Sequence, residues 1–204
     1  EIGVRLVGSE MCIRDRVYLG WGVNPLYANF VPTGEYSGLM TLPRELSLCE
    51  TEEGYRLKTK PFGIDEYRAG AFPIGNQKPL LTESFGLLVQ GNFGRIALKN
   101  SRGEEVVIEV TVDSITVDRS KSGDLSYFDD VDPKLFKKED LLVSTTKRYM
   151  RGNVNMEIIF DVSYLEIYAD GGLETASVCV YPDAPYQVVS TDGDLEVKMY
   201  TIKK

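Results

Sequence analysis

Few side chains in this sequence could carry out acid–base or nucleophilic chemistry near neutral pH. The chain contains no histidine, so it cannot supply a Ser-His or Cys-His nucleophile pair or the commonest zinc ligand. Cys49 and Cys179 are far apart in the sequence. Such spacing gives neither a disulfide framework nor a metal site, and it favours buried free thiols. We therefore expect no bound metal.

Carboxylates are plentiful, but their setting predicts solvated turns rather than a catalytic pair. The segment "FDDVDP" at residues 128–133 is acidic and lies in an expected loop. In "VDRSKSG", the side chains of Asp118, Arg119 and Lys121 could grip a substrate. A strand that ends in a hydrogen-bonded turn, or that docks on a neighbouring domain, explains this segment better.

Trp21 and Asn24 are the candidate binding residues. Trp21 is the only tryptophan, and it lies between two glycines at the start of a long loop. Its indole could offer a flat face to a sugar ring, although these residues by themselves favour a buried core tryptophan. Asn24 could hydrogen-bond a sugar hydroxyl, and capping of the loop by its side chain is equally compatible with the sequence.

The elements that position these residues are predicted to be strands throughout. Alternating or β-branched runs are separated by Gly, Asn, Asp and Pro turns, which is typical of an antiparallel sandwich or barrel. The runs are "GLMTLPRELSLCE", "GYRLKTK", "FGLLVQ", "RIALKN", "EEVVIEVTVDSITVDRS", "NMEIIFDVSYLEIYAD", "TASVCVYP" and "DLEVKMYTIKK". Only "DPKLFKKEDLL" indicates a helical turn, within a long loop. "ADGGLE" predicts a tight turn with Gly171 and Gly172 at positive φ.

Prolines suggest where the units of the chain begin and end. Pro43 predicts an edge or a bulge in its strand, and Arg44 and Glu45 would form a local pair or cap that bulge. The weakly patterned stretch around Pro61 and Pro73 predicts a linker over residues 61–78. It would separate a short unit at residues 17–60 from a complete sandwich at residues 79–204.

The overall charge excludes some partner classes. Lys and Arg number 23 against 31 Asp and Glu, for a net charge of −8. An acidic chain without a basic stripe argues against binding to nucleic acid or to an anionic membrane surface. No apolar run approaches the length of a membrane span. We therefore expect neither a nucleic-acid nor a membrane partner.

The first sixteen residues, "EIGVRLVGSEMCIRDR", follow no structural pattern and resemble a translated sequencing adapter. In-frame translation of a transposase-type sequencing adapter reproduces residues 6–16. We exclude residues 1–16 from the fold as an artefact. The net charge is unaffected, because the segment carries equal numbers of acidic and basic residues. We expect the native chain to begin upstream, so that this chain is a C-terminal fragment whose location, cytoplasmic or secreted, is left open.

Two sets of motifs carry a resemblance to a known family. The pattern "GW…N…YAN…PT…GLMTLPREL" resembles the end of the catalytic domain of glycoside hydrolase family 32, which includes invertases, levanases and inulinases. "ITVDRSKSG" and "LEIYADGGLETASVCVYP" resemble signatures of its C-terminal sandwich. The resemblance implies an all-β fold, in which a C-terminal β-sandwich is preceded by the last part of a five-bladed β-propeller.

The resemblance also implies a function for the parent protein. The family cleaves β-fructofuranosyl bonds in sucrose, levan or inulin with retention, using two carboxyl groups about 5–5.5 Å apart and no cofactor. None of its three catalytic motifs occurs here, so we expect an inactive fragment without catalytic residues. Trp21 matches the tryptophan that packs against bound sugar, which favours a pocket wall. The sandwich would stabilise the propeller and could mediate homo-oligomerisation.

Departures from the family leave alternatives open. Pro25 and Leu26 stand where another aromatic is common, and Tyr36-Ser37 replaces Trp-Arg or Trp-Asn. Linkage preference and substrate chain length are therefore open, as is the choice between hydrolase and fructosyltransferase. A stand-alone carbohydrate-binding or structural sandwich without catalysis is the alternative from another class. It does not explain the "GW…YAN…TLPREL" segment.

Overall fold

The structure is a computed structural model that describes residues 16–34, 38–74, 78–79 and 82–203, and its fold is all-β. The expected adapter therefore lies outside the described residues except for Arg16. Tyr36 and Ser37 also lie outside them. Among the described residues, no helix is long and apolar enough to cross a membrane.

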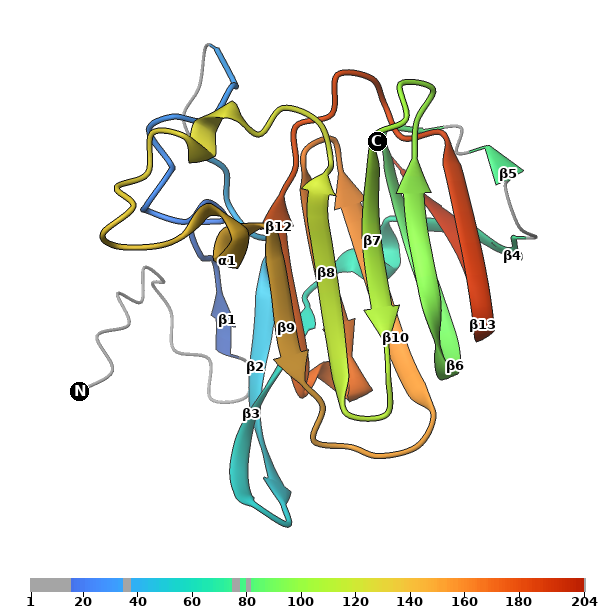
Figure 1. The fold of residues 1–204 in the computed structure, drawn as a ribbon. Coiled ribbons are helices and arrows are strands. Elements are labelled where there is room, and N and C mark those ends of the chain that lie inside the picture. Colours follow the sequence, from blue (N-terminus) through green and yellow to red (C-terminus); the bar gives the residue numbers. More distant parts are fainter. Residues whose placement is uncertain (1–15, 35–37, 75–77, 80–81, 204) are drawn as a thin grey trace.

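A small antiparallel sheet forms from the N-terminal part of the chain. It consists of β1 (Arg16–Tyr18), β2 (Arg44–Thr51) and β3 (Gly54–Pro61), in that order. Strand β2 begins directly after Pro43, which agrees with the rule that proline ends or interrupts a ladder. The β2–β3 hairpin extends away from the large sheet at its tip (Figure 1).

The rest of the chain forms a β-sandwich from one continuous, folded sheet. Its strand order is β12-β11-β10-β6-β7-β8-β9, with β13 beside β6. Figure 1 shows β7, β8 and β9 in front of β10 and β12. These strands have the following bounds: β6 (Ser84–Lys99), β7 (Glu105–Val110), β8 (Ser114–Lys121), β9 (Val143–Lys147), β10 (Val154–Asp161), β11 (Tyr164–Ala169), β12 (Glu174–Cys179) and β13 (Val188–Ile202).

Strand β6 belongs to both layers because it bends in its middle. Its first half pairs with β10 and its second half with β7, while β13 follows it along its whole length. Gly91 and Gly94 lie at the bend, where β13 crosses closely. A Cβ at Gly91 would lie 1.9 Å from the Asp194 carbonyl oxygen, so only glycine fits there. The sequence predicted two strands here, and the bend explains why a single strand reads as two.

Two other runs that were predicted as continuous each form two separate strands. "EEVVIEVTVDSITVDRS" forms the two strands β7 and β8, joined by a turn in which Thr111 N–H donates to the Ser114 carbonyl. "NMEIIFDVSYLEIYAD" likewise forms the hairpin β10–β11. The expected turn at "ADGGLE" is confirmed as η3 (Asp170–Gly172), with φ of 71° at Gly171 and 95° at Gly172. The predicted helical turn is α1 (Lys138–Leu142), and η2 (Ser126–Phe128) precedes it.

The segment expected to be a linker is more structured than its composition indicated. It contains η1 (Ile64–Glu66) and β4 (Arg68–Pro73), and β5 (Lys78–Pro79) follows. Both β4 and β5 pair with β13 at the edge of the sandwich. Each of the strands β3, β4 and β5 ends at a proline. Long-range pairing has here overridden a weak local pattern.

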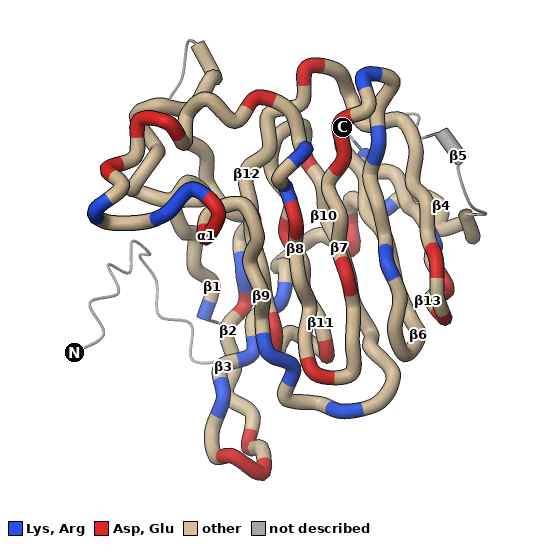
Figure 2. The backbone as a smooth tube through the Cα atoms, viewed as in Figure 1, with Lys and Arg blue, Asp and Glu red and all other residues tan. Residues whose placement is uncertain are grey.

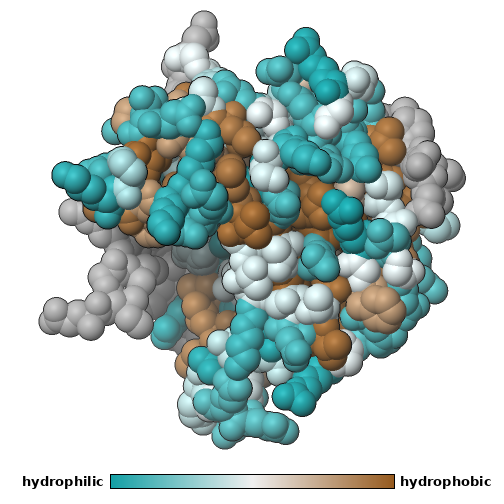
Figure 3. Space-filling model, in the orientation of Figure 1, coloured by the Kyte–Doolittle hydropathy of each residue, from teal (hydrophilic) through white to brown (hydrophobic). Residues whose placement is uncertain are grey.

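The main core lies between the two layers and is built from side chains such as Phe85, Leu98, Ile108 and Ile158, all fully buried. Acidic and basic positions are interspersed along the strands (Figure 2). On the face in Figure 3, hydrophilic residues predominate and apolar ones appear between them. Cys179 is buried and free, as predicted, whereas Cys49 on the small sheet is only partly buried.

Candidate functional site

The residues predicted from the sequence to bind a ligand line one cavity. This Trp21 cavity, of about 560 Å³, lies between the loop at residues 20–27 and the sandwich. Trp21 and Asn24 line it from the loop, and Ser144, Tyr164 and Ser177 line it from the sandwich. The structure thus brings both predicted residues to one place.

Trp21 presents its indole rather than burying it. The side chain is 54% exposed, which differs from the buried core tryptophan that the residues alone favoured. Its backbone forms an isolated antiparallel bridge with Met40. Gly38 packs so closely that a Cβ there would lie 2.4 Å from the indole Nε1. The indole therefore has one supported edge and an accessible ring, a shape suited to stacking on a sugar.

Asn24 performs the structural role that the sequence allowed for it. Its Oδ1 accepts a hydrogen bond of 3.0 Å from the Leu26 N–H. This Asx-type contact shapes the loop that carries Trp21. The side chain is exposed on the wall of the cavity.

One side of the cavity is fixed by Arg119 of β8. Its guanidinium donates to the carbonyl oxygens of Leu141 (2.7 Å) and Cys179 (2.8 Å) and to the Tyr27 hydroxyl (3.3 Å). Tyr27 also packs on Tyr127 and Phe128, with ring centroids 5.2 and 5.1 Å away. Arg119 is therefore a docking residue for the N-terminal loop. The predicted turn is also present, because Asp118 Oδ1 accepts from the Ser120 N–H.

The other side is fixed by Arg44 of β2. The sequence predicted a local pair of Arg44 with Glu45. In the structure Arg44 pairs instead with Glu166 on β11, whose Oε2 lies 2.7 Å from Arg44 Nη2. It also donates to the Tyr18 hydroxyl (3.1 Å) and to Ser177 Oγ (2.7 Å). The pair joins the small sheet to the sandwich. Two arginines thus fix the two ends of the segment that carries Trp21.

The electrostatics of the Trp21 cavity suit binding more than acid–base chemistry. Among the described lining residues, the only carboxylate is Asp140, which is exposed on α1. Burial raises the pKa of Tyr164 to about 12, and burial also raises the pKa of Tyr27. Both phenols therefore stay protonated at neutral pH and act as hydrogen-bond donors or acceptors.

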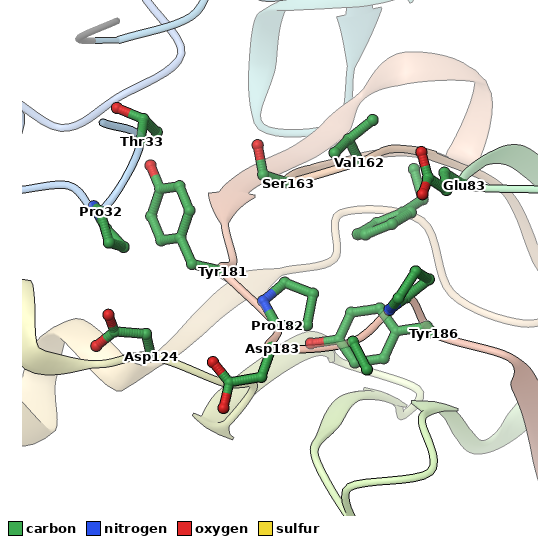
Figure 4. A pocket seen from close by; sticks show the side chains of 13 residues that line it. Pro32, Thr33, Glu83, Asp124, Val162, Ser163, Tyr181, Pro182, Asp183 and Tyr186 are labelled. Atoms are coloured by element: carbon green, nitrogen blue, oxygen red, sulfur yellow. The ribbon is translucent and has the colours of Figure 1, made fainter. Parts of the chain in front are cut away.

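A second cavity, of about 410 Å³, is lined by Pro32 and Thr33 and by residues 181–186 of the sandwich. Figure 4 shows the Tyr181 ring beside Pro182, with its hydroxyl directed toward Thr33. Three carboxylates line this cavity, those of Glu83, Asp124 and Asp183. Two of them are already engaged, since Asp124 Oδ1 accepts from the Ser126 N–H and Asp183 pairs with Arg102. The accessible aromatic face of Trp21 makes the first cavity the stronger candidate.

Several lining residues were not expected from the sequence. Tyr18, Tyr164 and Ser177 reach the cavity through strand pairings between distant segments, which no local pattern reveals. The signal for Arg44 was present in "TLPREL", but it indicated a local structural role beside Glu45 and not a partner on the sandwich. The buried carboxylate at Glu166, in an otherwise apolar strand, is the matching signal.

Comparison with known proteins gives a consistent result. The family model described as Glycosyl hydrolases family 32 C terminal matches residues 78–204. The Bacillus subtilis levanase is 25% identical over 210 residues, which cover 92% of this chain and 30% of the levanase. The chain thus spans less than a third of that relative's length.

Solved structures show the same fold. The exo-inulinase from Aspergillus awamori superposes with a TM-score of 0.76 at 19% identity, over 95% of this chain and 41% of the inulinase. The sucrose-6-phosphate hydrolase from Lactobacillus gasseri gives a TM-score of 0.72 at 17% identity, over 93% and 39% of the two chains. The family model covers residues 78–204, which is more than half of the chain. The chain therefore belongs to glycoside hydrolase family 32 and carries the C-terminal domain of that family.

Proposed function

We propose that this chain is the C-terminal part of a retaining β-fructofuranosidase acting on sucrose-, levan- or inulin-type substrates. Residues 17–60 would complete the last part of a catalytic β-propeller, residues 61–78 would connect it, and residues 79–204 would form the sandwich that stabilises it. The relatives support this substrate class, since they include a levanase and extracellular exo-inulinases.

The observation that carries the proposal is the exposed Trp21 in a cavity shared with Asn24. Sugar rings bind by stacking on aromatic faces and by hydrogen bonds to side-chain amides. Trp21 is 54% exposed, and the two residues line the same cavity. We infer that they form part of a fructosyl subsite. The alternative, a carbohydrate-binding module without a catalytic partner, uses the same residues but needs no second domain.

The chain by itself is proposed to bind without hydrolysis. Retention requires two carboxyl groups about 5–5.5 Å apart, as nucleophile and general acid/base. Among the described lining residues of the Trp21 cavity, Asp140 alone carries a carboxyl group. The catalytic pair would therefore come from polypeptide outside this sequence.

A chimera tests the proposal. The part of the Bacillus subtilis levanase that precedes the matched region is joined to residues 17–204, and fructose release from levan is measured. We expect release by the chimera, a large loss in its Trp21→Ala variant, and none by the 204-residue chain. Release by the unfused chain would contradict the proposed inactivity. A folded chimera in which Trp21→Ala has full activity would contradict the proposed subsite.

Binding to the unfused chain separates the two functions. Trp21 fluorescence is titrated with a fructo-oligosaccharide, with a malto-oligosaccharide as the control. We expect a response to the fructosyl sugar only. An equal response to both, together with an inactive chimera, would favour the binding module over the glycosidase.

A further inference from the structure

Glu166 is a buried carboxylate of the sandwich that faces the N-terminal segment. It lies on β11, with a side chain that is 2% exposed. Its neighbours on the strand, Leu165 and Ile167, belong to the apolar core on the opposite face. An ionised group in such a place is retained only when it is fully hydrogen-bonded.

Both carboxylate oxygens of Glu166 accept hydrogen bonds. Oε1 accepts from the Leu42 N–H at 2.7 Å, and Oε2 accepts from Arg44 Nη2 and Nε at 2.7 and 3.1 Å. The Tyr168 hydroxyl donates to Oε2. One carboxylate of the sandwich thus fixes both a backbone amide and a side chain of the segment at residues 42–44.

That segment in turn holds the backbone on both sides of Trp21. Thr41 Oγ1 accepts from the Gly20 N–H at 3.0 Å, and the Thr41 N–H donates to the Gly20 carbonyl at 2.9 Å. On the other side, the Gly22 N–H donates to the Leu39 carbonyl at 2.7 Å. The backbone on both sides of Trp21 is therefore held by residues 39–41, which lie directly before the residues that Glu166 anchors.

We propose that Glu166 is a positioning residue that sets the orientation of the Trp21 indole through Leu42, Arg44 and Thr41. The carboxylate does not reach the Trp21 cavity itself. It fixes the segment at residues 42–44, which follows the residues that hydrogen-bond to the backbone on both sides of Trp21. The geometric role stands on the contacts above, whereas its consequence for sugar binding rests on the proposed function.

The sequence provides a direct probe, because Trp21 is the only tryptophan. Acrylamide quenching and fluorescence anisotropy of the full 204-residue chain therefore report on this side chain alone. We expect Glu166→Gln to increase quenching and to lower anisotropy, because its amide cannot accept all the hydrogen bonds of the carboxylate. Circular dichroism verifies that the variant is folded.

Glu157→Gln is the matched control. Glu157 lies on the adjacent strand β10, accepts from Arg68 at 2.6 and 2.7 Å, and accepts from the Tyr200 hydroxyl at 2.5 Å. Like Glu166, it accepts from one arginine and one tyrosine, but the hydrogen bonds of the described residues do not join it to residues 39–44. We expect it to lower the unfolding midpoint and to leave Trp21 quenching unchanged. An equal change in quenching in both variants would overturn the positioning role.

Thr41 tests the second link without removing the buried ion pair. Thr41→Val removes the Oγ1 acceptor of Gly20, and Thr41→Ser retains it. We expect Val to reproduce the change in quenching caused by Glu166→Gln, and Ser to restore the wild-type value. If Val leaves both quenching and anisotropy at wild-type values in a folded chain, the proposed route through Thr41 is wrong.

The consequence for sugar is measured in the levanase chimera. There we expect Glu166→Gln to raise KM for levan by about ten-fold, the effect of losing about 1.4 kcal/mol of binding, with a smaller change in kcat. Altered Trp21 fluorescence with an unchanged KM would support the positioning role and count against the proposed fructosyl subsite. Unchanged fluorescence in every folded variant would overturn the positioning role whatever the KM.

Discussion

Two buried arginine–carboxylate pairs hold this molecule together in different ways. Arg44 and Glu166 have side chains that are 8% and 2% exposed, and Arg148 and Asp170 have side chains that are 0% and 3% exposed. The first pair joins residues 122 positions apart and links the small sheet to the sandwich. The second pair joins residues 22 positions apart and lies inside the sandwich. Similar chemistry thus secures an interface in one case and a loop in the other.

The two clusters also differ in how completely their carboxyl groups are hydrogen-bonded. Glu166 accepts from Leu42, Arg44 and Tyr168. Beside Arg148 and Asp170 lies a second carboxyl, Glu174, whose Oε1 accepts from the Tyr149 N–H at 2.6 Å while Oε2 is buried without a partner. Burial and the neighbouring Asp170 raise the pKa of Glu174 to about 7. Complete hydrogen bonding lets a buried carboxylate stay charged, and an unfilled lone pair favours its protonated form.

The largest effect is expected from Arg148→Ala. The Arg148 guanidinium is fully buried and donates to Asp170 at 2.8 Å and to the Thr111 carbonyl at 3.0 Å. Its removal leaves an uncompensated buried charge, so we expect a loss of about 3–5 kcal/mol in the free energy of unfolding. Urea unfolding measures it. A loss below about 1 kcal/mol would mean that water reaches Asp170 more easily than its burial indicates.

Arg44→Ala should have a smaller and more local effect. We expect a loss of about 3 kcal/mol, concentrated at the interface between the small sheet and the sandwich. Hydrogen exchange should show faster exchange in β2 and β3, with protection retained in β6 and β10. The double variant Arg44→Met/Glu166→Leu should regain much of the stability. Uniformly faster exchange over the sandwich would contradict the proposed division between interface and loop.

Glu174→Gln sharpens the comparison through pH. The pKa of Glu174 is raised from 4.5 to about 7, so the folded protein holds a proton that the unfolded chain releases above 4.5. Its contribution to stability is present below pH 4.5 and is lost as the pH rises through about 7. We expect Glu174→Gln to be more stable than the wild type at pH 8, by on the order of 2 kcal/mol, and equal to it at pH 4. Thermal unfolding from pH 4 to 8 measures this.

The control for that experiment is Glu196→Gln, which changes an exposed carboxylate on β13. Its stability should follow the wild-type pH profile. If Glu174→Gln also follows that profile, the buried carboxyl is not the group that titrates near neutral pH.

The smallest effect is expected at an exposed pair. Arg102 Nη1 lies 3.3 Å from Asp183 Oδ2, with side chains that are 61% and 56% exposed. We expect Arg102→Ala to change the free energy of unfolding by less than about 0.5 kcal/mol, because water and salt screen such pairs. Urea unfolding at low and high salt measures it. A change as large as that of Arg44→Ala would remove the distinction between buried and exposed pairs on which the comparison depends.

Local signals in the sequence predicted much of the fold. Alternation predicted the strands of the sandwich, and "ADGGLE" predicted the turn at Gly171 and Gly172, because both signals depend on neighbouring residues. The bend in β6 was missed because it requires β13 to cross at Gly91. The pairing of β4 with β13 was missed because it, too, joins segments that are far apart in the sequence.

The candidate site was predictable only in part. Trp21 and Asn24 were identified from one short motif, and they do line one cavity. The residues that position them were not, because the partner of Arg44 lies on a strand 122 positions away. Asp170, a non-glycine residue with φ of 52°, likewise pairs with Arg148, a contact between residues 22 positions apart that no local pattern encodes.

The long pairing of β6 with β13 has a consequence for how the protein is made. The ladder joins Phe85 to Thr201 and Lys99 to Val188, so it connects the first long strand of the sandwich to the last described strand. During synthesis, β13 can pair with β6 only after the residues between the two strands have been made. Contacts of such high sequence separation slow folding and leave strand edges open to aggregation. Until β13 is present, the edge of β6 that it covers therefore stays unpaired.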